Sequence, residues 1–317
     1  MSIVLFALLP LLAHSSPLWD YVHRDDGQYS YYDTGKKLTA SGWTGHLLNV
    51  TSQAWLNASD FVGPYGHIWT HQVLVIVPTK VNYPDAGALY ITGNGNDQPP
   101  NQIPDETDED VLVCASLAVT VGTVCSVLWQ IPNAPIVFSA DALRKERSED
   151  AAVAFTWSQY MLYERDRPEW ILYYPMAKAA IKAMDATSDY INLISGNNLT
   201  RWITAGASKR GATTWLTGAV DKRIIGIVPI VFDVLNFKTG VQHMWETLGN
   251  WTFAFTDYRD MSSWRKKYFL WFPPLNLPPS SHTLKRTHAS QPPARPPARN
   301  PQILQSTLMM ALTTWTS

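Results

Sequence analysis

The sequence predicts an α/β fold in which a mostly parallel β-sheet carries helices on both faces. Strand-like and helix-like segments alternate along residues 71–232, which is typical of strand–helix–strand units. A serine flanked by glycines, Ser208, stands between an apolar run and a helix-compatible segment. The 317-residue chain is 46% hydrophobic, which suits one medium-sized domain with a large core. We expect that domain to cover residues 17–260.

The first half of the domain supplies three predicted strands and one helix. His71–Pro78 and Gly87–Thr92 read as strands separated by a turn rich in Pro, Asn and Asp. Asp105–Leu117 starts with acidic side chains and then becomes apolar, as expected for a helix whose N-terminus favours negative charge. Val124–Gln130 is the next predicted strand.

The second half continues the alternation. Ser148 is expected to be the N-cap of a helix over residues 149–163. A further helical stretch is predicted over 168–190, where Pro175 should break or kink it. The wholly apolar run 224–232 predicts a strand in the buried centre of a parallel sheet.

The segment Gly206–Gly211 carries the strongest functional signal. A strand over 202–205 enters it and a helix over 212–219 leaves it. Hydrolases of the α/β type place a nucleophilic serine on such a sharp turn, where the following helix directs N–H groups at developing negative charge. The usual pattern is G-x-S-x-G, whereas here Arg210 precedes the second glycine. We therefore predict an α/β-hydrolase-like domain with Ser208 as nucleophile, a glycine-rich packing turn being the alternative.

Two further segments are candidate parts of the same site. Gly93, Asn94, Gly95 and Asn96 follow a predicted strand, where hydrolases place the second oxyanion donor, although a plain turn is an equal alternative. Asp233 follows the last apolar strand at its carboxyl end, where active sites of open sheets gather. It is the best-placed candidate for a catalytic acid, and the alternative is a turn-forming Asp.

The N-terminus predicts export. Residues 3–12 are apolar but too short to span a bilayer, and a small-x-small cleavage pattern follows, so residues 1–16 are expected to be a signal peptide. A buried first strand is the alternative. The secretory pathway could glycosylate four sequons, at Asn49, Asn57, Asn198 and Asn250. We expect a secreted, extracellular protein.

Composition and cysteine usage limit the metals, cofactors and partners that we expect. The two cysteines, Cys114 and Cys125, either form a disulfide or are a buried free pair, and they lack zinc spacing. No metal and no cofactor is expected, because the sequence has neither a zinc signature nor a phosphate-binding loop. A net charge of −1 gives no sign of a nucleic-acid partner, and no stable membrane span is expected.

Residues 261–317 differ in character from the rest of the chain. They contain no Asp, Glu or Gly, and most of their prolines come in pairs. Such a segment cannot build strand–helix units. We expect a proline-rich tail that is disordered or aberrant.

Many ordered segments between Trp19 and about Asp260 resemble the family of PhoPQ-activated pathogenicity-related proteins, which includes secreted autocrine proliferation repressor proteins of amoebae. The matching segments are residues 30–33, 48–56, 91–96, 130–135, 147–150, 176–185, 206–211 and 232–236. The resemblance implies an α/β-hydrolase fold, export and a serine elbow at Ser208. The elbow is also similar to that of glucuronoyl esterases, in which the basic residue after the serine helps to hold the oxyanion, so Lys209 is a candidate for that task.

The chain departs from this family beyond Tyr258. Family members continue into strands that carry an acid loop and a late histidine, whereas here the proline-rich tail follows. We therefore expect a sheet that is incomplete at the C-terminus and a Ser–acid–His triad that is incomplete, with little or no hydrolase activity. Two functions remain: a secreted serine hydrolase acting on a small ester or amide, or a non-catalytic secreted signalling protein that binds a cell-surface receptor.

Overall fold

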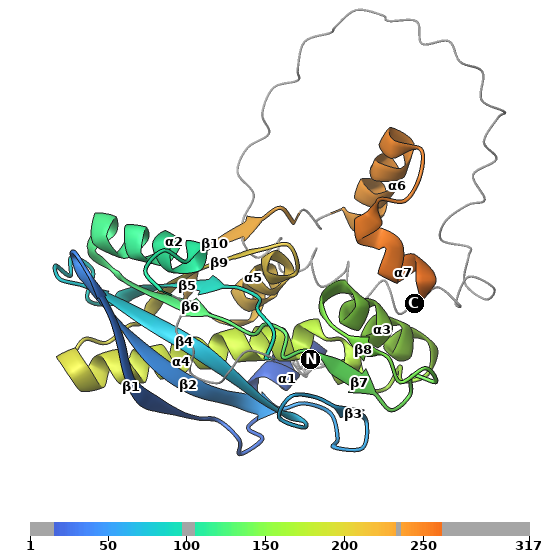
Figure 1. Cartoon of the computed structure of the whole chain (residues 1–317), viewed down its shortest axis with the longest axis horizontal. Coiled ribbons are helices and arrows are strands. Elements are labelled where there is room, and N and C mark those ends of the chain that lie inside the picture. Colours follow the sequence, from blue (N-terminus) through green and yellow to red (C-terminus); the bar gives the residue numbers. More distant parts are fainter. Residues whose placement is uncertain (1–15, 97–104, 233–235, 262–317) are drawn as a thin grey trace, which may run out of the picture.

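A seven-stranded sheet forms the centre of the molecule (Figure 1). The computed structural model describes residues 16–96, 105–232 and 236–261. Across the sheet the strands follow the order β1-β2-β4-β6-β5-β9-β10. These strands are β1 (Ser30–Ala40), β2 (Trp43–Ala54), β4 (Ile68–Pro78), β6 (Val124–Leu128), β5 (Ala86–Ile91), β9 (Arg201–Ala207) and β10 (Ile224–Ile230). Helices cover both faces, so the predicted α/β class is confirmed.

The sheet is mixed. β1, β2, β4 and β6 are antiparallel neighbours, whereas β6, β5, β9 and β10 run parallel to one another. The three strands predicted in the first half of the domain are present as β4, β5 and β6, with small differences at their ends. β1 and β2 are not among the predicted strands, and they form the antiparallel edge of the sheet. The parallel half carries the serine elbow.

Strand β10 corrects one expectation. The apolar run 224–232 was expected in the buried centre of the sheet, although a sheet incomplete at the C-terminus also implied an unpaired edge on this strand. β10 is the last strand in the order and pairs only with β9 among the described residues. Its side chains are half-buried or exposed, and Ile225 is 60% exposed. Helix α5 (Lys209–Val220) covers one face of the strand, where Ile227 packs against Gly218. An apolar strand sequence therefore did not distinguish a central strand from an edge strand.

Alternate residues of β4 enter two different hydrophobic cores, one on each face of the sheet. Val73 and Val75 pack in the larger core with residues of α4 (Tyr173–Ser195) and α5. Leu74 and Ile76 pack in the smaller core with residues of α2 (Glu109–Leu117). This division follows from the two-residue period of a strand, which points successive side chains to opposite faces. The long helix α4 crosses the face of the sheet opposite α2 (Figure 1).

Two helix starts differ from the prediction. α2 begins at Glu109, because Asp108 caps it by accepting hydrogen bonds from Asp110 N (3.0 Å) and Val111 N (3.2 Å). α4 begins at Tyr173, so Pro175 lies in its first turn and neither breaks nor kinks the helix. Proline is tolerated there because the N–H groups of a first turn have no partner within the helix.

The remaining elements lie around this sheet. A second, three-stranded sheet consists of β3 (Phe61–Val62), β7 (Ile136–Phe138) and β8 (Glu146–Arg147). The other helices are α1 (Pro17–His23), α3 (Glu149–Leu162), α6 (Phe237–Leu248) and α7 (Thr256–Asp260). The predicted helix after Ser148 is thus present as α3. Almost all of the predicted leader and tail lies outside the described residues. Within the described ranges, no helix combines the length and the apolar character that crossing a bilayer requires.

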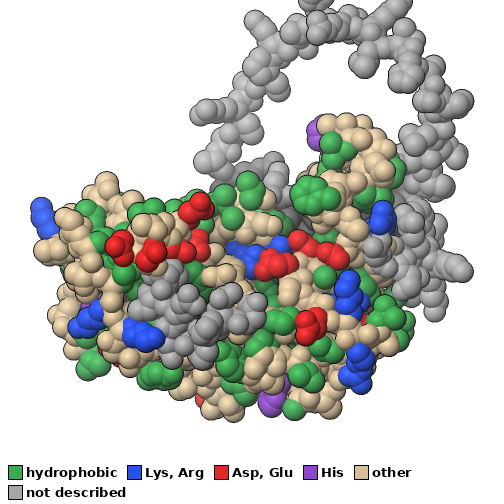
Figure 2. Space-filling view, viewed as in Figure 1, with side chains coloured by type: hydrophobic (Ala, Val, Ile, Leu, Met, Phe, Trp, Pro, Cys, Tyr) green, Lys and Arg blue, Asp and Glu red, His purple; other side chains and the backbone are tan. Residues whose placement is uncertain are grey.

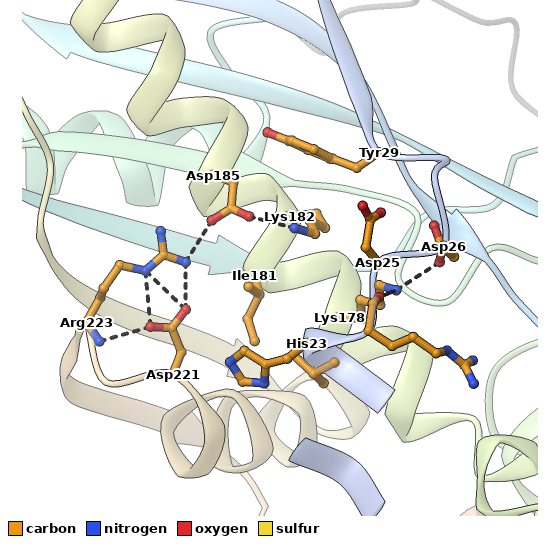
Figure 3. Close-up of a pocket in the computed structure, with 12 residues that line it drawn as sticks. His23, Asp25, Asp26, Tyr29, Lys178, Ile181, Lys182, Asp185, Asp221 and Arg223 are labelled. Carbon is orange, nitrogen blue, oxygen red and sulfur yellow. Dashed lines mark hydrogen bonds and ion pairs between the residues drawn. The ribbon is translucent and has the colours of Figure 1, made fainter. Parts of the chain in front are cut away.

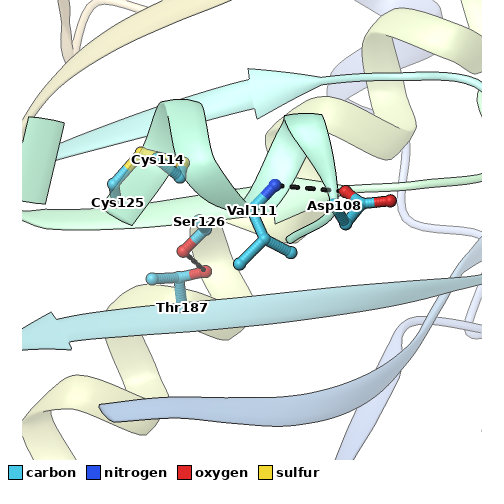
Figure 4. The surroundings of a disulfide bond; sticks show 6 residues. All are labelled: Asp108, Val111, Cys114, Cys125, Ser126 and Thr187. Carbon is cyan, nitrogen blue, oxygen red and sulfur yellow. Dashed lines mark hydrogen bonds between the residues drawn. A yellow bond between two sulfur atoms is a disulfide. The ribbon is translucent and has the colours of Figure 1, made fainter. Parts of the chain in front are cut away.

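A disulfide joins α2 to the sheet (Figure 4). Cys114 on α2 and Cys125 on β6 are bonded, which decides between the two possibilities that the sequence left open. Both cysteines are buried. The next residue on β6, Ser126, points to the opposite face and hydrogen-bonds Thr187 on α4 (3.1 Å). β6 is therefore tied to a helix on each face.

Candidate active site at the Ser208 elbow

Ser208 occupies a sharp turn between β9 and α5. Its backbone has φ +55° and ψ −121°, a conformation that L-residues rarely adopt. The turn is held by a hydrogen bond from Ser208 N–H to the carbonyl of Ile230 on β10 (2.9 Å). The strand, the turn and the helix are in the predicted order, and this is the geometry that presents a nucleophile above the sheet in α/β hydrolases.

The glycines on either side of Ser208 leave room for this turn. A Cβ atom on Gly206 would lie 2.7 Å from the carbonyl oxygen of Arg210. A Cβ atom on Gly211 would lie 2.8 Å from Cβ of Phe232 and 3.0 Å from the carbonyl oxygen of Ile230. A side chain at either position would force the strand and the helix apart. The shifted spacing, with Gly211 in place of a glycine at 210, therefore still closes the turn.

The hydroxyl of Ser208 is not used to cap the helix. Ser208 stands at the N-cap position of α5, but its side chain makes no capping hydrogen bond. The first backbone N–H of α5 that reaches an intrahelical acceptor is that of Ala212, which bonds the Ser208 carbonyl (3.1 Å). The preceding N–H groups, including that of Lys209, lie at the positive end of the helix dipole. A structural serine at this position would normally accept one of them.

The ends of the parallel strands are aligned beside Ser208. Ile91, the last residue of β5, pairs with Leu128 of β6 and with Gly206 of β9. Ile230, the last residue of β10, pairs with Ala207. The segments that follow these four strands therefore leave the sheet at one edge, where ligands of open α/β sheets bind.

Backbone strain is concentrated at this edge. Among the described residues, seven non-glycine residues have positive φ, and four of them lie within three residues of the ends of the parallel strands. These four are Asn94, Gln130, Ser208 and Val231. Such conformations cost of order 1–3 kcal/mol each and cluster at functional sites. The distribution of strain supports a functional site at the carboxyl edge of the sheet.

A cluster of four charged residues packs beside the elbow. Arg210 donates two hydrogen bonds to Glu149 (2.7 and 2.5 Å) and one to the carbonyl of Ile131 (2.5 Å). Lys209 forms ion pairs with Glu149 (3.0 Å) and Asp150 (2.9 Å). Figure 2 shows basic side chains beside acidic ones on the face where α5 and α3 meet. We call Glu149, Asp150, Lys209 and Arg210 the elbow cluster.

The cations of the elbow cluster are more buried than its anions. The side chains of Lys209 and Arg210 are 8% and 11% exposed, whereas those of Glu149 and Asp150 are 46% and 32% exposed. Burial opposes the ionisation of Glu149, but the hydrogen bond and charge of Arg210 and the charge of Lys209 outweigh it and lower the pKa of that carboxyl. Glu149 therefore stays ionised at neutral pH.

The elbow cluster also changes the description of three residues. Lys209 was a candidate for holding the oxyanion. In the structure its ammonium group instead forms ion pairs with two carboxylates. Glu149 and Asp150 were expected only as acids of a helix first turn. The signal that could have identified their role is Arg210, which stands where the usual elbow has glycine and needs an anionic partner when buried. Asp150 additionally accepts a hydrogen bond from Tyr258 (3.0 Å).

The candidate oxyanion loop follows β5 at the same edge. Gly93 lies against the guanidinium of Arg210, so the loop and the elbow are in contact. Asn94 is exposed and has φ +72°. Asn96 is buried and bonds the backbone of Ala134 (2.9 and 3.4 Å). The side chain of Asn96 therefore fixes the loop, and Gly93, Asn94 and Gly95 are the positions left for a ligand.

The other predicted residues lie apart from the elbow or outside the described structure. Asp233 is outside the described residues. Of the sequons, Asn57, Asn198 and Asn250 are exposed, whereas Asn49 is half-buried on β2 between its two neighbouring strands. Within the described ranges, no group of three or more His, Cys, Asp or Glu side chains has a metal-binding arrangement.

The described histidines have positions away from Ser208. His71 is buried, and its Nε2 lies 3.0 Å from Ser52 Oγ while Asn133 Nδ2 lies 3.2 Å from its Nδ1. His46 contacts Tyr190, and His243 is exposed on α6. In the part of the chain that the structure describes, no histidine hydrogen-bonds the Ser208 hydroxyl.

Comparison with known proteins finds a matching family model and a similar protein. The family model described as PhoPQ-activated pathogenicity-related protein matches residues 18–267. The chain is similar to autocrine proliferation repressor protein A of Dictyostelium discoideum, with 38% identity over 260 residues. That match covers 81% of this chain and 49% of the relative, so the chain spans about half of the relative's length.

Solved structures with a similar backbone include two esterases. A glucuronoyl esterase from Solibacter usitatus has a TM-score of 0.40 at 13% identity, covering 75% of this chain and 62% of its own. Acetyl xylan esterase 1 from Thermoanaerobacterium sp. JW/SL YS485 has a TM-score of 0.40 at 12% identity, covering 79% and 64%.

Proposed function

The chain belongs to the PhoPQ-activated pathogenicity-related protein family, and we propose that it is a secreted protein with a serine-hydrolase scaffold whose nucleophile is Ser208. The substrate class is a small ester or amide. The observation that best supports this proposal is the strained elbow. It holds Ser208 above the sheet, and the Ser208 hydroxyl makes no capping hydrogen bond to the helix.

The proposed chemistry is acyl transfer to the serine. Ser208 Oγ attacks the substrate carbonyl carbon, and the leaving alcohol or amine departs with the serine proton once the new Oγ–C bond has formed. The backbone N–H of Lys209 and the Gly93–Gly95 loop are the proposed donors to the oxyanion. Helix α5 also stabilises negative charge at this point, because the positive end of its dipole faces the elbow.

The proposed activity is weak. A complete triad needs a base that hydrogen-bonds the serine and an acid that orients the base. The described residues provide no histidine at Ser208, so we propose a nucleophile that can be acylated but turns over slowly.

A fluorophosphonate probe tests the proposal. We expect covalent labelling of the folded protein at Ser208, located by peptide mass spectrometry, and no labelling of Ser208→Ala. Ser158, a buried serine on α3, offers a matched control, and Ser158→Ala should be labelled like the parent. Equal labelling of the parent and Ser208→Ala would contradict the nucleophile assignment. Turnover of p-nitrophenyl acetate, measured in parallel, separates a working hydrolase from a protein that is only acylated.

The second candidate is a non-catalytic secreted signalling protein that binds a cell-surface receptor. It is favoured by the similarity to a relative named for autocrine proliferation repression. The two candidates make different predictions for Ser208→Ala in a cell-proliferation assay. A signalling protein retains its effect after the substitution, whereas a hydrolase loses it.

Export is part of the proposal. The disulfide between Cys114 and Cys125 supports it, because such bonds persist in oxidising compartments. Three sequons, at Asn57, Asn198 and Asn250, are exposed and accessible to glycan chemistry. Expression in eukaryotic cells should give secreted protein whose mass falls on N-glycosidase treatment. An unprocessed, glycan-free product retained inside the cells would contradict export.

A further inference from the structure

A cavity lies at the opposite end of α5 from the elbow (Figure 3). It has a volume of about 500 Å³, which is in the range of small-molecule sites. Asp221 caps the C-terminus of α5 and lines this cavity, whereas Ser208 stands at the N-terminus of the same helix. The 12 residues of α5 span about 18 Å at 1.5 Å per residue. The cavity is therefore a different site from the candidate active site.

One wall of the cavity carries a continuous ionic chain. Arg223 donates hydrogen bonds to both oxygens of Asp221 and forms an ion pair with Asp185 Oδ1 (2.8 Å). Lys182 pairs with the other oxygen, Asp185 Oδ2 (3.0 Å), and its ammonium lies 4.6 Å from the centre of the Tyr29 ring. Both oxygens of Asp185 and of Asp221 are thus engaged.

The opposite wall comes from the segment after α1. Lys178, whose side chain is 2% exposed, donates hydrogen bonds to Asp26 Oδ2 (2.8 Å) and to the carbonyl of Arg24 (2.6 Å). Asp25 Oδ1 accepts only the N–H of Gly27 (2.9 Å) among the described residues, and Asp25 is exposed. Figure 3 places Asp25 and Asp26 across the cavity from Arg223 and Asp221, with Ile181 between the two walls.

The two walls have unused hydrogen-bonding capacity of opposite kind. On the ionic chain, the described residues provide one acceptor for the three hydrogens of the Lys182 ammonium, and they provide none for Arg223 Nη1. Across the cavity, Asp25 Oδ2 has no donor among the described residues. One side can therefore take an anionic group, and the other can take a cationic group.

A buried charge supports a built site. Holding Lys178 and Asp221 nearly out of solvent is unfavourable unless each is paired, and both line the cavity in paired form. Rigidly paired charges around a cavity present fixed donors and acceptors to a ligand without reorganisation. Ile181 supplies an apolar surface between them.

We propose that this cavity binds a small zwitterion, a free amino acid or a dipeptide, with its carboxylate at Lys182 and Arg223 and its ammonium group at Asp25. The opposite unused groups select a ligand that carries both charges. An inorganic anion satisfies only one wall, and a simple amine satisfies only the other. This inference does not depend on the chemistry of Ser208.

Isothermal titration calorimetry with the whole protein tests the proposal. The probe is glycyl-L-alanine, titrated to about 10 mM. The matched probes are glycyl-L-alaninamide, which lacks the carboxylate, acetylglycyl-L-alanine, which lacks the ammonium group, and inorganic phosphate. We expect the dipeptide to bind at least about tenfold more tightly than each matched probe, because each lacks one charge-assisted hydrogen bond.

Three variants test which wall of the cavity binds each charged group of the dipeptide. Asp25→Asn should weaken the dipeptide about tenfold and leave acetylglycyl-L-alanine unchanged. Lys182→Met should weaken the dipeptide similarly and leave glycyl-L-alaninamide unchanged. Ser208→Ala should bind the dipeptide like the parent. Thermal melts of each variant show whether it is folded before titration.

The outcomes that overturn the proposal are specific. It is wrong if the parent protein does not bind glycyl-L-alanine, if either capped dipeptide binds as tightly as glycyl-L-alanine, or if phosphate binds as tightly or more tightly. It is also wrong if a folded Asp25→Asn or Lys182→Met protein binds the dipeptide unchanged.

Discussion

The guanidinium of Arg210 lies directly against the backbone of Gly93. Its Nη2 is 2.6 Å from the position that a Cβ atom of residue 93 would occupy. Glu149 and the carbonyl of Ile131 hold the guanidinium in that position through three hydrogen bonds. The loop after β5 and the elbow after β9 are therefore fitted to each other, and a change in one is transmitted to the other.

Alanine substitutions at three glycines should lower the free energy of unfolding to different extents, according to how closely each glycine is packed. Gly93→Ala should lower the free energy of unfolding by about 1–3 kcal/mol, because the methyl group displaces Arg210 from its partners. Gly206→Ala should cost about 3 kcal/mol or more, since its Cβ meets the backbone carbonyl of Arg210, which cannot move alone. Gly240→Ala on α6 is the control, because its Cβ meets nothing within 4 Å, and it should be neutral or slightly stabilising. Urea denaturation checks the order, and equal effects at residues 93 and 240 would contradict it.

Removing the central anion of the elbow cluster should destabilise the elbow. Glu149→Gln leaves Arg210 without its two charged hydrogen bonds and Lys209 with Asp150 alone. Because the Glu149 side chain is 46% exposed, solvent screens the loss, and we expect a cost of about 1–2 kcal/mol. The control is Glu146→Gln, an exposed residue on β8 that should change stability by less than about 0.5 kcal/mol. A Glu149→Gln protein as stable as this control would show that the pairs contribute nothing.

Acid should destabilise the protein partly through His71. Burial lowers the pKa of His71 from 6.5 to about 4, so the folded state keeps this ring neutral at pH values where the unfolded chain binds a proton. The neutral His71 ring therefore contributes fully to the free energy of unfolding above pH 6.5. This contribution, roughly 3 kcal/mol in total, is lost as the pH falls from about 6.5 to about 4. His71→Gln should lose this part of the pH dependence, measured as the slope of unfolding free energy against pH. His243→Gln, at an exposed position on α6, is the control, and equal slopes for His71→Gln and the parent would contradict the assignment.

Opening the disulfide should weaken the attachment of α2. Cys114 and Cys125 are 11 residues apart, and closing a loop of this size restricts the unfolded chain by about 3 kcal/mol. The double variant Cys114→Ala/Cys125→Ala should lose about 2–4 kcal/mol of stability in guanidinium chloride. Dithiothreitol should destabilise the parent and leave the double variant unchanged. A reductant effect on the double variant would show that another process is responsible.

Local patterns in the sequence were sufficient for the strands at the centre of the sheet and for the elbow. Apolar runs with turn residues at their ends marked β4, β5 and β6, because a buried strand needs continuous apolar side chains. The elbow was recognisable because Gly206 and Gly211 reflect a steric requirement that acts within a few residues of Ser208. The start of α3 after Ser148 was also predicted, although the Ser148 side chain makes no capping hydrogen bond.

Non-local contacts decided what the sequence left open. Among the described residues, the apolar run of β10 is at the edge of the sheet, because strand order depends on chain crossovers, which composition does not encode. The partnership of Arg210 with Glu149 joins residues 61 positions apart, and the ionic chain from Lys182 to Arg223 needs α4 and the end of α5 to lie together. The sequence by itself determined the α/β class, the serine elbow and its glycines, because these rest on local sterics and short periodicities. Tertiary structure alone decided which charges pair around the elbow and which line the cavity at the other end of α5, because an ion pair depends on distance in space and not on separation along the chain.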